Sequence, residues 1–128
     1  MSRKTLEALA VGVAIWVAGM LLVGWAGDAA YFPVAAVPAA FAALPLMYAL
    51  TRFHLRDVPA SEKWFAAIRF GVLVVAVQFP LDTLGWWAIF NLGYPPHGQA
   101  AREATMLGLE IGYFWMLAVP YWVGRRNR

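Results

Sequence analysis

The chain has 128 residues, of which 62% are hydrophobic and only 13% are charged. This apolar share is far above that of a soluble domain, and the length suits a single domain with few elements. The sequence contains no cysteine, which excludes disulfides, thiolate metal sites, iron–sulfur clusters and a cysteine nucleophile. The ten lysines and arginines flank apolar runs, a pattern that indicates orientation in a bilayer and not nucleic-acid binding.

The first two apolar runs, residues 6–26 and 29–50, each have about the 20 residues that a helix needs to cross a bilayer. A cleaved signal peptide is the alternative for the first run, but its apolar stretch exceeds the usual signal length of about 7–15 residues. In the second run, small residues recur every four positions and predict a ridge for helix packing. These residues are Ala35, Ala39 and Ala43.

A charged segment, residues 51–63, follows and is predicted to be a loop. It contains His54, while His97 lies in a turn-rich loop after the third apolar run. The two histidines therefore belong to opposite sides of the membrane and cannot share a metal or haem. We expect both to have surface roles.

The third apolar run, residues 64–87, is the centre of the sequence. Trp64 stands at its start and Trp86 and Trp87 at its end, where interfacial aromatic residues are expected. Gln78 and Asp82 lie four residues apart inside it and so share one helix face. Polar side chains at such depth are costly and need a partner.

The fourth apolar run, residues 103–123, ends at Tyr121 and Trp122, which mark the interface on the side of the chain termini. Gly108 and Gly112 form a GxxxG pattern that predicts close approach of another helix. Glu110 lies between the two glycines, about 18 Å from Trp122 by helical rise, and is therefore near the middle of the bilayer. Gln78 lies about 21 Å from Trp64 and matches this depth.

Nine of the ten basic residues fall on one side of the predicted membrane topology. The positive-inside rule then places both chain termini in the cytoplasm. The nine are Arg3, Lys4, Arg52, Arg56, Lys63, Arg69, Arg125, Arg126 and Arg128, and the exception is Arg102. The sequence thus predicts an all-α integral membrane protein, a four-helix bundle with both ends in the cytoplasm, located in the cytoplasmic (inner) membrane.

The three intramembrane polar residues, Gln78, Asp82 and Glu110, allow two interpretations. In the first, Glu110 is protonated and hydrogen-bonded to Gln78, while Asp82 reaches the outer interface and pairs with Arg102. In the second, the three residues form a proton or cation site, because no basic residue lies at their depth to neutralise the acids. The first interpretation is structural, and the second implies transport.

The sequence shows no nucleophile–base pair, no metal-ligand set and no phosphate-binding loop, so we expect neither an enzyme nor a cofactor. The leading hypothesis is a non-enzymatic accessory or structural subunit that assembles with other membrane subunits. The alternative is a small homo-oligomeric proton-coupled carrier or ion channel that uses Glu110 and Asp82. The expected surroundings are the lipid bilayer and helices of the same or another chain.

Overall fold

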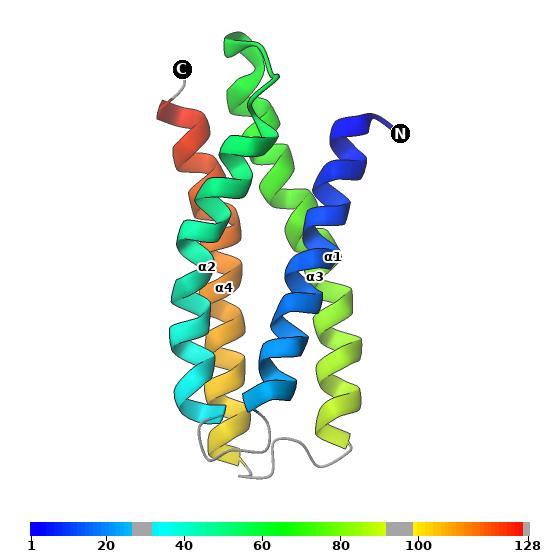
Figure 1. Ribbon diagram of the computed structural model, residues 1–128, viewed down its shortest axis with the longest axis vertical. Coiled ribbons are helices and arrows are strands. Elements are labelled where there is room, and N and C mark those ends of the chain that lie inside the picture. Colours follow the sequence, from blue (N-terminus) through cyan, green and yellow to red (C-terminus); the bar gives the residue numbers. More distant parts are fainter. Residues whose placement is uncertain (27–31, 92–98, 127–128) are drawn as a thin grey trace.

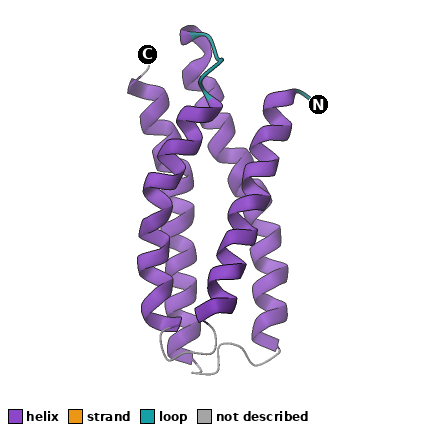
Figure 2. Cartoon of the chain, in the orientation of Figure 1, coloured by secondary structure: helices purple, strands orange, loops and turns teal. Residues whose placement is uncertain are grey.

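The computed structural model describes residues 1–26, 32–91 and 99–126; within these ranges, the side chains of residues 22–26, 32–37, 39, 86, 87, 89–91, 99–102, 104 and 105 lie outside the description. The described residues form four α-helices, one short 3-10 helix and no strand (Figure 2). The elements are α1 (Arg3–Ala26), α2 (Phe32–His54), the 3-10 helix η1 (Ala60–Glu62), α3 (Lys63–Asn91) and α4 (Gln99–Arg126). The all-α class predicted from the sequence is confirmed.

The helices form an up-and-down bundle in which α1 and α3 run in one direction and α2 and α4 in the other (Figure 1). Helix α4 packs along both α2 and α3, whereas α1 packs mainly against α3. The start of α1 and the described end of α4 lie at the same end of the bundle, together with the α2–α3 connection (Figure 1). We call this the terminal end, and the opposite one the far end.

Three helices are long and apolar enough to cross a membrane: the qualifying stretches are Arg3–Leu21, Ala60–Gly85 and Met106–Arg126. They belong to α1, α3 and α4, and they support the membrane character predicted from the sequence. That α2 also crosses stays a prediction.

Helix α2 ends later than predicted, because it continues through His54 where the sequence suggested a loop from residue 51. The hydroxyl of Thr51 donates to the carbonyl of Met47, 2.6 Å away and one turn earlier. A polar side chain that bonds back to its own helix in this way can be buried, and Thr51 is fully buried. The helix therefore carries His54 into the bundle and not into solvent.

The described hydrophobic core lies in the terminal half of the bundle. Its largest fully buried side chains are Phe70, Met47 and Val74. Residues of α1, α3, α4 and the turn after α2 complete it: Ala8, Leu55, Ala67, Met116, Val119 and Val123. This core fixes the relative positions of the helix ends that carry the polar residues at the terminal end.

Glycines let α3 and α4 approach closely at two points. A Cβ added at Gly71 would lie 2.8 Å from the backbone oxygen of Met116, and one at Gly124 would lie 2.8 Å from the Cβ of Ala67. Gly108 and Gly112 of the predicted GxxxG ridge are buried, but a Cβ at Gly112 would meet no atom of the described structure within 4 Å. The close contacts between α3 and α4 thus lie nearer the terminal end than the GxxxG ridge, and the approach of another helix at Gly108 and Gly112 stays a prediction.

The predicted alanine ridge of α2 can be followed only in part. Ala43 is half-buried, and its neighbour in the preceding turn, Ala40, belongs to the buried residues. The side chains of Ala35 and Ala39 lie outside the described residues.

Candidate functional site

Gln78 bridges α3 and α1 in the bundle interior. Its side-chain amide donates a hydrogen bond to the backbone carbonyl of Gly12, and its exposed fraction is only 3%. The two helices meet closely there, because a Cβ on Gly12 would lie 3.0 Å from the Cβ of Val77. The buried amide is therefore satisfied by a helix contact within the chain.

Asp82 lies one turn further along α3 and bonds to α4. The phenolic hydroxyl of Tyr113 donates a hydrogen bond to its carboxylate, and both residues are half-buried. The predicted pairing of Asp82 with Arg102 falls outside the description, since the side chain of Arg102 is not described. Asp82 is thus held between two helices by a phenol that the sequence analysis did not assign.

Glu110 is exposed on the outer surface of α4. The predicted hydrogen bond between Glu110 and Gln78 is wrong, because Gln78 faces α1 and donates to Gly12. Among the described residues, Glu110 takes part in no hydrogen bond or ion pair. The three intramembrane polar residues therefore do not form one site: two link helices, and the third points outward.

A second polar cluster joins α1 and α2 at the terminal end. The Nδ1 atom of His54 lies 3.0 Å from a carboxylate oxygen of Glu7. The ammonium of Lys4 donates to the backbone carbonyl of His54 at 2.6 Å and lies 3.5 Å from the other oxygen of Glu7. The carboxylate of Glu7 therefore lies between an imidazole and an ammonium, and all three groups anchor the start of α1.

The surface role expected for His54 is wrong, because this residue is only 4% exposed. Its ring stacks on Phe70 at a centroid distance of 4.5 Å. Burial lowers the pKa of His54 below the ordinary value of 6.5, although the hydrogen bond to Glu7 acts in the opposite direction. The imidazole is accordingly neutral near pH 7, and its Nδ1–H donates to Glu7.

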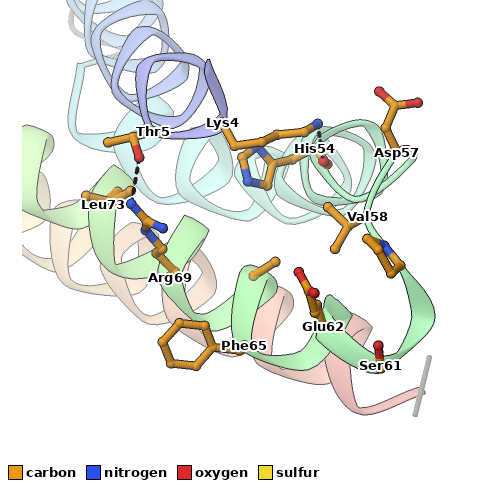
Figure 3. Close-up of a pocket in the computed structure, with 12 residues that line it drawn as sticks. Lys4, Thr5, His54, Asp57, Val58, Ser61, Glu62, Phe65, Arg69 and Leu73 are labelled. Atoms are coloured by element: carbon orange, nitrogen blue, oxygen red, sulfur yellow. Dashed lines mark hydrogen bonds between the residues drawn. The ribbon is translucent and has the colours of Figure 1, made fainter. Parts of the chain in front are cut away.

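A cleft of about 590 Å³ opens beside this cluster, between the start of α1 and the first turns of α3 (Figure 3). Its wall includes Lys4 and His54 on one side and Glu62 and Arg69 on the other. The guanidinium of Arg69 donates to the hydroxyl of Thr5 at 2.6 Å, across the two helices. The cleft therefore combines charged groups of both signs at one end of the bundle.

Aromatic side chains cluster at the same end. Trp64 packs edge-on against Tyr121 at 4.9 Å, and Trp122 packs against Tyr48 at 6.0 Å. The guanidinium of Arg126 lies 4.2 Å from the centre of the Trp122 ring. Trp64, Tyr121 and Trp122 thus share one level of the bundle, as an interfacial belt would. The side chains of Trp86 and Trp87 lie outside the described residues.

The described residues include no group of three or more histidine, cysteine or acidic side chains that could hold a metal ion. Two buried indole nitrogens, those of Trp16 and Trp115, have no hydrogen-bond partner in the described part of the chain. Comparison with protein-family models, curated proteins and solved structures finds no match.

Proposed function

We propose that this chain is a non-enzymatic subunit of a membrane complex and that the outer face of α4 binds a helix of another membrane subunit. The observation that carries the proposal is the exposed position of Glu110 near the middle of α4, a helix long and apolar enough to span a membrane. A carboxyl group exposed to hydrocarbon at that depth costs about 2.5–3.5 kcal/mol on insertion scales. Acidic residues of membrane helices therefore face protein or water, and a partner supplies that environment here.

Glu110 belongs to a continuous stripe on α4. The exposed residues Met106, Phe114, Leu117 and Tyr121 follow the helical spacing of three or four residues on either side of it. The opposite side of the helix carries the buried residues Gly108, Gly112, Met116 and Val119. The stripe thus offers a partner helix a long apolar contact with one hydrogen-bonding group at its centre.

The geometry of the other polar residues also supports a structural role. Gln78 and Asp82 hold α3 against α1 and α4 through hydrogen bonds within the chain. The basic residues Arg3, Lys4 and Arg125 lie at the terminal end of the bundle, as expected if that end faces the cytoplasm of an inner-membrane protein. We propose this orientation together with the function.

Photocrosslinking in native membranes tests the proposed interface. Phe114 and Phe79 form a matched pair, because they are exposed to 61% and 63% and lie on α4 and α3. A photoreactive phenylalanine at position 114 should crosslink to one defined membrane protein, whereas the same residue at position 79 should label lipid. Lipid labelling alone from both positions would contradict the proposal.

Variants of Glu110 distinguish a subunit of a membrane complex from a proton-coupled carrier. Glu110→Gln keeps the hydrogen-bonding capacity, so the crosslink should persist and the free energy of unfolding should change by less than about 1 kcal/mol. Glu110→Leu should weaken the crosslink while leaving the isolated chain folded. Loss of the fold in either variant would place Glu110 inside this chain's own packing.

One observation favours the carrier as a second candidate: the half-buried carboxyl of Asp82 lies between α3 and α4 and bonds to a phenol. A proton-coupled carrier needs such a group inside the bundle. Proteoliposomes with a pH gradient should then show flux that Asp82→Asn abolishes. Flux that is absent from the wild-type chain with each cation tested would remove this candidate.

A further inference from the structure

The cleft at the terminal end plays no part in the function proposed above, and its charges point to a ligand. We propose that it binds the head group of a zwitterionic aminophospholipid of the phosphatidylethanolamine type. The phosphate contacts Arg69 and the ammonium contacts Glu62, two side chains that line the cleft (Figure 3). The site would make the lipid a bound component of the folded chain, whichever partner α4 has.

The charge balance of the wall selects this lipid class. Four charged side chains line the cleft: Lys4, Asp57, Glu62 and Arg69. Two of them are already neutralised, since Lys4 lies 3.5 Å from Glu7 and Arg56 donates to Asp57 at 3.1 Å. In the described part of the chain, Arg69 and Glu62 have no ion-pair partner. One positive and one negative group remain, which complements a phosphate and an ammonium.

Arg69 is held in place to meet a phosphate. Its guanidinium donates one N–H to the hydroxyl of Thr5, whose oxygen lies 2.8 Å from the hydroxyl of Ser2. Ser2 also accepts a hydrogen bond from the backbone N–H of Thr5, at the start of α1. A guanidinium has five N–H donors, so four remain for an anion, and a phosphate can accept two of them side by side.

The position of the cleft favours a membrane lipid over a soluble phosphate. Arg69 lies six residues inside α3, about 9 Å along the helix axis from Lys63. An arginine at this depth faces a water-filled cleft or a lipid phosphate. Phe65 and Leu73 lie one turn to either side of Arg69 on the cleft wall, and Phe65 is 71% exposed. They offer an apolar surface for the acyl chains beside the head group.

Binding to the purified, delipidated full-length chain in detergent tests the proposal. The probes are short-chain phosphatidylethanolamine, phosphatidylcholine and phosphatidylglycerol, together with soluble phosphoethanolamine and inorganic phosphate. The wild-type chain should bind phosphatidylethanolamine most tightly. Phosphatidylcholine should bind more weakly because its quaternary ammonium cannot donate a hydrogen bond to Glu62. Both soluble probes should bind weakly because they have no chains to contact Phe65 and Leu73.

Variants of the two charges sharpen the test. R69Q should weaken phosphatidylethanolamine binding by on the order of tenfold. E62Q should abolish the preference for phosphatidylethanolamine over phosphatidylglycerol. R52Q is the matched control, because Arg52 is an exposed arginine that bonds to Tyr48 and does not line the cleft. It should bind like the wild type.

Thr5→Val is a control for loss of folding. It removes the hydroxyl that accepts the hydrogen bond from Arg69 and keeps the positive charge of Arg69. It should weaken lipid binding less than R69Q, with an unchanged circular dichroism spectrum. Equal lipid affinities of R69Q and R52Q would overturn the proposal. Tighter binding of phosphatidylglycerol to the wild type, or equal affinity for phosphoethanolamine and the lipid, would overturn it as well.

Discussion

The terminal half of the bundle and its far half are held together by different contacts. In the terminal half, Phe70, Met47 and Val74 are fully buried, and Gly71 brings α3 against the backbone of α4. Further along α3, the contacts between helices include the polar side chains Gln78 and Asp82, each bonded to a neighbouring helix. The interior of the terminal half thus relies on close packing, with its hydrogen bonds between helices at the end of the bundle, whereas further along α3 hydrogen bonds lie in the interior itself.

This difference follows from the bilayer as a solvent. Lipid tails are as apolar as a helix surface, so the hydrophobic effect does not drive membrane helices together. Helices associate instead through van der Waals contact, which small residues permit, and through hydrogen bonds, and both can act at the same place. Around Gly71 and Gly124 the helices are in close contact, whereas Gln78 and Asp82 add hydrogen bonds, in the case of Gln78 beside the close approach of Gly12 to α3. Variants that disturb only the close packing or only the hydrogen bonds should show how much each kind of contact contributes to the free energy of unfolding.

The largest effect is expected from Gly71→Ala. The added Cβ would lie 2.8 Å from the carbonyl oxygen of Met116 and 3.2 Å from the Cγ of the buried Pro120, so α3 and α4 must move apart. Such overpacking costs about 1–3 kcal/mol in the free energy of unfolding. Gly112→Ala is the control, because its Cβ meets open space and alanine favours the helix. Equal unfolding free energies of both variants would refute the close contact.

Tyr113→Phe should have the next largest effect. It removes the hydroxyl that donates to Asp82 and leaves the carboxylate with one donor fewer inside the bundle. Hydrogen bonds between membrane helices are worth about 0.6 kcal/mol on average and up to about 1.7 kcal/mol. A double-mutant cycle with Asp82→Asn measures the coupling directly. Zero coupling energy would show that the two side chains do not stabilise each other.

A smaller loss in the free energy of unfolding is expected from Gln78→Leu. The carbonyl of Gly12 lies within α1 and keeps its place in the helical hydrogen-bond ladder, so no buried acceptor is left without a partner. The loss should therefore stay near the average of about 0.6 kcal/mol for a membrane hydrogen bond. Unfolding in mixed micelles measures it. A loss above about 2 kcal/mol would mean that Gln78 has a further role in the fold.

The smallest effect on stability is expected from a change in pH. Burial lowers the pKa of His54 below 6.5, so the unfolded chain binds more protons than the folded chain as the pH falls through this range. The melting temperature should therefore decrease between about pH 7 and about pH 5, and His54→Gln should reduce this decrease. An identical pH dependence in the variant would show that His54 does not cause the effect.

The hydropathy of the sequence predicts the helices well, because three of the four predicted runs are found as helices long and apolar enough to span a membrane. The partners of the polar residues could not be predicted in the same way. Depth along a helix matches Glu110 with Gln78, but the rotation of each helix decides which side chains face each other. Gln78 faces α1 and Glu110 faces outward for this reason.

The polar cluster at the terminal end was missed for a related reason. Glu7 and His54 are 47 residues apart; Glu7 lies at the start of the first apolar run and His54 follows the second, so neither spacing nor composition connects them. The only local signal is the threonine at position 51, which can bond back to its own helix and extend it. Because Thr51 is helical, His54 lies at a helix end and not in a loop.

The bonds of α1 have a consequence for the order in which the chain is assembled. Its partners are made late: Arg69 follows Thr5 by 64 residues, and Gln78 follows Gly12 by 66. At a synthesis rate of about 5–20 residues per second, α1 waits roughly three to thirteen seconds for α3. In the first part of this interval, before residue 54 is made, the carboxyl of Glu7 lacks His54 and has only Lys4 as a partner. We therefore expect the newborn helix to stay near the membrane surface or beside the insertion machinery until its neighbours emerge.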